Sequence, residues 1–170
     1  MPNQSTTEAA AQSFSRVFDA PRALVWKAWT TPEYVMQWWG PKGFTCPLCR
    51  IDLRIGGRFT YAMATPDGQV GYNGGEFRDI VLLERIVWLW HFADADGNRV
   101  SPANYGLPHE DRAGNIDEIR FEQDSNGQTK LTYTRNDPTA SQEEKDGVAA
   151  AFEQIFDKLA TVIAALAHTA

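Results

Sequence analysis

Two cysteines, Cys46 and Cys49, form a C-x-x-C pattern and are the first candidates for metal or redox chemistry. A structural zinc site needs four ligands, and the three histidines, His91, His109 and His168, are not spaced as metal ligands. Side chains three residues apart on a strand also point to opposite faces of the sheet. We therefore expect no metal and no cofactor.

Proton transfer has three candidates, Tyr61, Tyr133 and His91, each of which could act as a general acid or base. His91 alternates with Trp90 and Phe92, so on a strand its ring faces the side opposite to theirs. The sequence identifies no partner that would orient His91. No Gly-x-Ser-x-Gly motif occurs, so a serine nucleophile is not indicated.

Large apolar side chains give the strongest functional signal, since the chain has six tryptophans and nine phenylalanines. Alternation along the strands and the apolar stripe of the last helix place eight residues around one space: Tyr61, Met63, Trp88, Trp90, Phe121, Tyr133, Phe152 and Ile155. Such side chains either fill a core or line a ligand pocket. As a set they exceed what packing against an alanine-rich helix requires, which favours a pocket.

The adjacent Trp38 and Trp39 either cover the entrance of this pocket or fasten the short helices to the sheet, and the sequence leaves both roles open. Arg120, Arg135, Glu76 and Asp79 occupy strand positions from which a polar group could reach the mouth of a cavity. We expect surface ion pairs for these four residues.

Hydrophobic periodicity predicts the elements that position these groups. The expected strands cover 13–19, 44–53, 58–65, 71–80, 85–92, 116–123 and 129–135. Two short helices separate the first two strands, with Pro21 opening one and Gly40-Pro41 ending the other. The strand at 85–92 is apolar on both faces, so we expect it in the centre of the sheet.

A long helix is predicted from Ser141, where Glu144 completes a capping box. Its apolar stripe consists of Val148, Phe152, Ile155, Phe156, Leu159, Val162, Ile163 and Leu166. About 25 residues at 1.5 Å each span roughly 38 Å, enough to cross a sheet. The segment 94–115 is too long for an ordinary hairpin loop, so it is a candidate lid or homodimer interface.

Composition is that of a globular protein, with 43% hydrophobic residues in 170. The net charge of −6 and the pI near 5.0 predict no affinity for nucleic acid or anionic membranes. No apolar run is long enough to span a membrane, and the first residues do not form a secretion signal, so we expect a cytoplasmic protein. The domain organisation that we predict is a flexible N-terminus, 1–12, followed by one domain, 13–168.

Several short motifs resemble those of a known family. The opening ones are Asp19-Ala20-Pro21, Val25-Trp26, Ala28-Trp29, Thr31-Pro32 and Trp38-Trp39. Others resemble one bacterial branch: Gly43-Phe44-Thr45-Cys46-Pro47, Asp52-Leu53-Arg54, Gly56-Gly57-Arg58, Ser101-Pro102 and Tyr105-Gly106-Leu107-Pro108. From Ser13 to Leu166 the chain is similar to the activator of heat-shock protein 90 ATPase homologue family (C-terminal domain type), within the START-like or SRPBCC superfamily. One departure is Ala151-Phe152, where the family often has Gly-Trp.

This resemblance implies an α+β helix-grip fold (START-like, Bet v 1-like): a curved antiparallel sheet, two short helices, a long C-terminal helix and a cavity between that helix and the sheet. Function does not follow from fold alone. The aromatic set without a convergent catalytic group favours a non-catalytic module that binds a small hydrophobic molecule. Two alternatives remain open: a cyclase or dehydratase acting on an aromatic or polyketide-like substrate, and, from the family name, a co-chaperone that stimulates a heat-shock protein ATPase.

Overall fold

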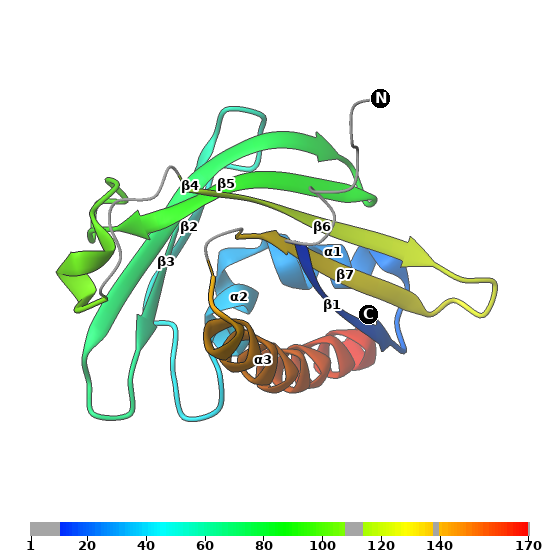
Figure 1. Cartoon of the computed structure of the whole chain (residues 1–170). Helices are drawn as coiled ribbons and strands as arrows, with labels where there is room; N and C mark the ends of the chain where they lie inside the picture. The colour runs from blue at the N-terminus through cyan, green and yellow to red at the C-terminus, as the bar shows by residue number, and fades with distance from the viewer. Residues whose placement is uncertain (1–10, 108–113, 138–139, 170) are drawn as a thin grey trace.

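The computed structural model describes residues 11–107, 114–137 and 140–169. In this part of the chain, an antiparallel sheet curves around the long helix α3 (Gln142–Thr169) (Figure 1). The two short helices, α1 (Arg22–Thr30) and α2 (Pro32–Trp38), lie beside α3 in the hollow of the sheet. This is the α+β helix-grip architecture that the sequence predicts. The concave face of the sheet therefore faces all three helices.

Seven strands in the described residues form the sheet: β1 (Ala11–Phe18), β2 (Cys49–Ile51), β3 (Arg58–Ala64), β4 (Val70–Val81), β5 (Arg85–Ala93), β6 (Asn115–Gln123) and β7 (Thr129–Asn136). Their order is β1-β7-β6-β5-β4-β3-β2, and each neighbouring pair is antiparallel. The strand β5 is central, as its two apolar faces predict.

Two strands differ in extent from the prediction. The predicted strand at 44–53 forms a ladder only over β2, with an isolated bridge between Thr45 and Ala64 before it. Pro47 lies between the two pairings, and its missing N–H cannot join a ladder. At the other end of the sheet β1 begins at Ala11, so Ala11 and Gln12 of the predicted flexible segment 1–12 are paired with β7, whereas residues 1–10 lie outside the described residues.

The helix α3 starts with the predicted capping box. The backbone N–H of Ser141 donates to Oε2 of Glu144 at 2.9 Å, and the N–H of Glu144 donates to Oγ of Ser141 at 3.2 Å. Six residues of the predicted stripe are buried: Phe152, Ile155, Phe156, Leu159, Val162 and Ile163. None of the helices in the described ranges has the length and apolar character needed to cross a membrane.

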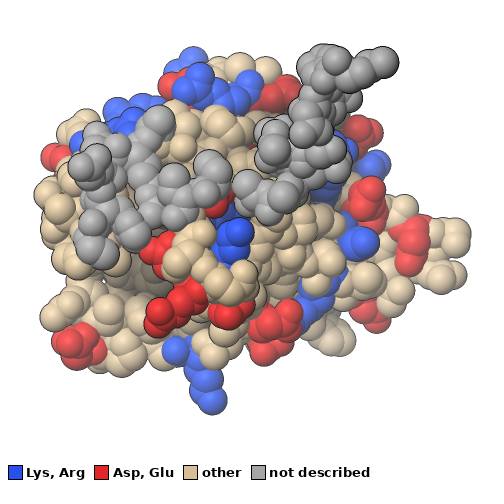
Figure 2. All heavy atoms as spheres, viewed as in Figure 1, with Lys and Arg blue, Asp and Glu red and all other residues tan. Residues whose placement is uncertain are grey.

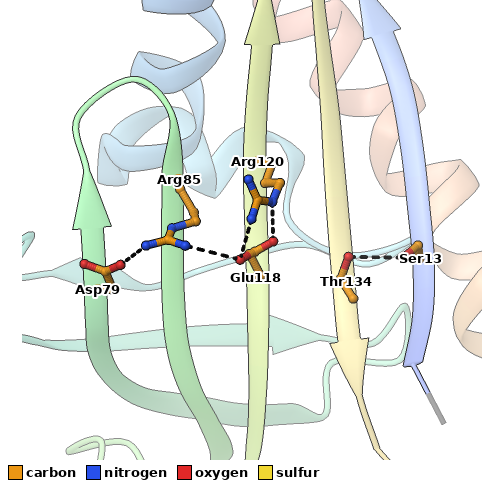
Figure 3. Close-up of polar contacts among 6 residues, drawn as sticks. All are labelled: Ser13, Asp79, Arg85, Glu118, Arg120 and Thr134. Carbon is orange, nitrogen blue, oxygen red and sulfur yellow. Dashed lines mark hydrogen bonds and ion pairs between the residues drawn. The ribbon is translucent and has the colours of Figure 1, made fainter. Parts of the chain in front are cut away.

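The convex face of the sheet carries ion pairs (Figure 3). Arg85 bridges Asp79 on β4 and Glu118 on β6, and Nε of Arg120 lies 2.5 Å from Oε1 of Glu118. The surface pairs predicted for Asp79 and Arg120 are therefore present, and each such exposed pair adds only about 0–1 kcal/mol to stability. Acidic and basic side chains are interspersed over the molecular face in Figure 2 as well.

The described part of segment 94–115 folds back along β4 and β5. It contains the 3-10 helix η2 (Pro102–Tyr105), and the Tyr105 hydroxyl donates to the carbonyl oxygen of Ala93 and accepts from the N–H of Tyr72 at 3.1 Å. Residues 108–113 lie outside the described residues. Tyr105 therefore fastens this segment to the sheet beside the hollow that α3 spans.

Candidate functional site

Two adjoining cavities lie between the concave face of the sheet and the first half of α3. The first has a volume of about 440 Å³ and the second of about 300 Å³. Six residues line both: Met63, Asn73, Trp90, Arg135, Val148 and Ala151. Pockets for small molecules have volumes of roughly 300–1,000 Å³, so each cavity is large enough to hold a small ligand.

Of the eight residues predicted around the cavity and Trp38, a candidate at its entrance, four lie on these walls. Met63 and Trp90 line both cavities, and Tyr133 and Ile155 line the second one. They come from four different elements, β3, β5, β7 and α3. The sequence therefore predicted a set of strands and a helix face that the fold does bring together around a hollow.

The other five predicted residues, Trp38, Tyr61, Trp88, Phe121 and Phe152, line neither cavity and are buried in the core. Their rings pack on other aromatic rings. The Trp88 ring stacks on Phe59 with a centroid distance of 4.4 Å, the Phe121 ring lies 5.0 Å from Trp26, and the Phe152 ring stacks on Phe14 at 4.5 Å. For Trp38, Phe121 and Tyr61 the physical reason is that tryptophans of α1 and of the end of α2 fill the hollow there: Trp29 packs on Trp38 and Phe121, and Trp39 packs on Tyr61.

Trp38, the last residue of α2, and Trp39, its C-cap residue, take different positions. Nε1 of Trp38 donates to the carbonyl oxygen of Ala28 at 2.9 Å, and its ring lies 4.7 Å from that of Trp29. Trp38 thus joins α2 to α1. Trp39 lines the second cavity and packs on Tyr61 at 5.1 Å.

Polar residues also line the cavities, at strand positions whose side chains face the core. We call Asn73, Asn115, Asp117 and Arg135 the polar strip. Arg135 lines both cavities and is opposite Asp117 in the β6–β7 ladder. Asn73, Asn115 and Asp117 are 7%, 7% and 2% exposed. Polar groups placed this deeply are costly to fold, which makes the strip a candidate binding surface.

Asp117 and Tyr133 form the shortest polar contact on the wall of the second cavity. The Tyr133 hydroxyl donates to Oδ2 of Asp117 at 2.5 Å, and the N–H of Asn136 donates to Oδ1 at 3.3 Å. Burial raises the pKa of Asp117 above its ordinary value, and the Tyr133 hydroxyl and Arg135 oppose this shift. Burial, followed by the charge of Asp117, raises the pKa of Tyr133 well above its ordinary value. Tyr133 therefore stays neutral and donates a hydrogen bond to Asp117.

The raised pKa of Asp117 predicts a pH dependence of stability. The folded protein holds this proton more tightly than the unfolded chain, so Asp117 favours folding below its ordinary pKa of 3.8 and less so as pH rises through the raised value. We compare the wild type with Asp117→Asn by the difference between their melting temperatures, wild type minus variant. We expect this difference to be more positive near pH 4 than near pH 7. Thermal unfolding followed by circular dichroism measures both, and a difference that is constant or grows toward pH 7 would contradict the expectation.

Arg135 is placed differently from the sequence expectation of a surface ion pair. Its guanidinium lies 5.8 Å from the centre of the Trp90 ring, on the cavity wall. It also pairs with buried Asp137, at 3.5 Å between Nη2 and Oδ2. An arginine held over an aromatic face keeps its N–H edge available to a planar acceptor.

His91 and the cysteines lie in less reactive settings. Nδ1 of His91 is 2.9 Å from the carbonyl oxygen of Phe92, so this nitrogen carries the proton, and burial lowers the pKa of the ring. Burial raises the pKa of Cys46 to about 11 and also raises that of Cys49, so both thiols are protonated at neutral pH. Within the described residues, no group of three or more metal-binding side chains occurs.

Asn73, Asn115 and Asp117 line the cavities but were not among the residues predicted from the sequence. For Asn115 and Asp117 a signal was present in the sequence, because they are in phase with the core residues Ile119 and Phe121 on β6. A polar residue in phase with a buried apolar row is unusual on a strand that faces a core. That pattern could have identified these two residues.

Comparison with known proteins agrees with this fold. Solved structures from Nitrosomonas europaea and Chromobacterium violaceum have TM-scores of 0.75 and 0.72, with 23% and 25% identity. The alignments cover 94% and 91% of this chain and 97% of each of the other two. An AHSA1-like protein from Aeromonas hydrophila has a TM-score of 0.66 and 19% identity, over 92% of this chain and 94% of the other.

No curated protein matches the sequence. A family model, Activator of Hsp90 ATPase homolog 1-like protein, matches residues 19–164, which include α1, most of the cavity walls and most of α3. The chain therefore belongs to the Activator of Hsp90 ATPase homolog 1-like protein family, in the START-like superfamily.

Proposed function

We propose that the protein binds a small hydrophobic or aromatic molecule in the two cavities and holds it without converting it. The observation that carries the proposal is the pair of adjoining cavities, of about 440 and 300 Å³, between α3 and the concave face of the sheet. Small-molecule sites are mostly apolar hollows with a few convergent polar groups. The walls have this composition.

The walls divide into an apolar side and a polar side. On α3, Val148, Ala151 and Ile155 face the second cavity, together with Trp39 and Trp90. The polar strip lies on the sheet. A ligand with a flat apolar body would be held between the α3 face and Trp90, with its polar atoms next to the strip.

Native mass spectrometry tests this proposal. Protein purified gently from its own cells would be compared with the same sample after denaturation. We expect an additional mass of a few hundred daltons at most, consistent with the cavity volume, that disappears on denaturation. No additional mass, together with no saturable binding of aromatic probes, would contradict the proposal.

A second candidate function is an acid–base enzyme of the cyclase or dehydratase kind, and the Asp117–Tyr133 pair is the observation that favours it. Both side chains line the second cavity, at 2.5 Å from each other. A buried carboxyl group with a raised pKa can move a proton to or from a bound substrate. Tyr61, another candidate of the sequence analysis, lines neither cavity.

Under this second candidate, Tyr133→Phe is expected to lower kcat by about 10²–10⁴ because the proton-transfer pair is broken. The dissociation constant of the substrate should stay nearly the same, since the ring remains. Turnover of aromatic polyketide-like compounds measures the rate, and equilibrium titration measures binding. Unchanged rates in Tyr133→Phe, Tyr61→Phe and His91→Gln would end this candidate.

A further inference from the structure

The Oδ1 atom of Asn73 is a buried polar atom without a hydrogen-bond partner in the described part of the chain. Asn73 lies on β4, opposite Tyr61 and Phe92 in the neighbouring strands, and is 7% exposed. Among the described residues, no donor lies within hydrogen-bond reach of its Oδ1 atom. Buried polar atoms in folded proteins almost always have a partner, and leaving one without a partner destabilises the fold. Asn73 lines both cavities, so a molecule in the cavities can supply the missing partner.

Arg135 provides donors at the same walls. A guanidinium has five N–H groups. In the described part of the chain, its ion pair is with Oδ2 of Asp137, at the long distance of 3.5 Å. The Trp90 ring covers one face of the group, at 5.8 Å. N–H groups of Arg135 are therefore left for an acceptor within the cavities.

The charges on the walls select a neutral ligand. Among the described residues, three cationic and three anionic side chains line the cavities: Arg99, Arg135, Lys145, Asp117, Asp137 and Glu144. An anion placed at Arg135 would also meet Asp137, its ion-pair partner, and Asp117, its neighbour in the β6–β7 ladder. Like charges at close range disfavour binding. A neutral acceptor avoids this repulsion.

We propose, on the basis of the proposed function, that the ligand is neutral and carries two separated polar groups on a flat apolar body, since β6 and β5 lie between the strands of Arg135 and Asn73. A carbonyl oxygen accepts from Arg135, and a hydroxyl or N–H group donates to Oδ1 of Asn73. The apolar body lies against Trp90, Met63 and Ala151, which line both cavities.

Three probes with one naphthalene body test the proposal: 6-hydroxy-2-acetylnaphthalene, 2-ethylnaphthalene and 6-hydroxy-2-naphthoate. Titration calorimetry should give a Kd for the neutral hydroxy-ketone about tenfold lower than for the hydrocarbon, as expected for one to two hydrogen bonds made in a buried site. The naphthoate should bind more weakly than the hydroxy-ketone. Equal affinities for all three probes, or tightest binding of the naphthoate, would overturn the inference.

The variant Asn73→Leu tests the contribution of the Asn73 amide to binding separately from that of the apolar cavity walls. In this variant the tenfold preference for the hydroxy-ketone should shrink to about twofold or less, whereas the Kd of 2-ethylnaphthalene should stay the same or fall. Thr129→Val is the matched control, because Thr129 is also buried but its hydroxyl donates to the carbonyl oxygen of Ala20 at 2.8 Å. The control should keep the preference.

Thermal unfolding without any probe gives an independent result. Asn73→Leu should raise the melting temperature by roughly 2–4 °C, because it removes a buried polar atom without a partner. Thr129→Val should lower it. If Asn73→Leu lowers the melting temperature as Thr129→Val does, the amide has a partner within the fold and the inference fails. If none of the probes binds the wild type, the proposed function itself fails, whereas probes that bind without the stated preference overturn only this inference.

Discussion

Ala151→Trp is expected to abolish binding of 2-ethylnaphthalene, with a Kd raised by at least about a hundredfold. Ala151 lies on the face of α3 that lines both cavities, next to Val148 one turn before it. An indole ring at this position would occupy the space between α3 and Trp90 that the ligand needs. Tryptophan fluorescence or calorimetry would measure the change in affinity.

Ala150→Trp is the control for this substitution. Ala150 is the preceding residue of α3 and its side chain is exposed. The same indole ring is therefore added to the same helix, outside the cavities, and the Kd should stay within about twofold of the wild type. Equal affinity in the two variants would show that the probe does not bind between α3 and the sheet.

Gly75→Ala is expected to lower the free energy of unfolding by about 3 kcal/mol or more. A Cβ atom at Gly75 would lie 1.7 Å from the carbonyl oxygen of Leu89 and 2.7 Å from the Phe59 ring. The Phe59 ring is held between Phe77 and Trp88, with centroid distances of 5.4 and 4.4 Å, so it cannot move away freely. Urea denaturation measures the change.

Gly147→Ala is the matched glycine substitution with the opposite sign. Gly147 lies in α3, and a Cβ atom there meets no atom within 4 Å. Alanine in a helix interior is favoured over glycine by about 0.5–1 kcal/mol, so this variant should be more stable than the wild type. A stabilised Gly75→Ala would contradict the close packing of β4 against Phe59.

The parts of the fold that local sequence patterns determine could be predicted. The capping box of Ser141 and Glu144 and the apolar stripe of α3 are properties of one helix and need no knowledge of its neighbours. The central position of β5 follows from its two apolar faces in the same way. Strand β2 was predicted too long because alternation continues through residues that Pro47 keeps out of the ladder.

The limits of the cavity could not be predicted from the sequence. Alternation of apolar residues shows which face of a strand a side chain lies on, but not where along the strand the cavity begins. Tyr61 and Met63 share the inner face of β3, yet only Met63 lines the cavities, whereas Tyr61 packs beneath Trp39. The same holds on β5 for Trp88, in the core, and Trp90, on the wall. What separates the members of each pair is where other side chains fill the hollow, which is a property of the assembled fold.

The most direct test of the cavity is a methyl NMR titration with 2-ethylnaphthalene, using protein labelled at the methionine methyl groups. The chain has three methionines, of which Met63 lines both cavities and Met36 is 40% exposed on α2, away from them. A ligand between α3 and the sheet should shift the Met63 methyl signal in a saturable way, give cross-relaxation to the probe, and leave Met36 unchanged. A Met63 signal that does not move at saturating probe, or equal shifts for Met63 and Met36, would contradict the account.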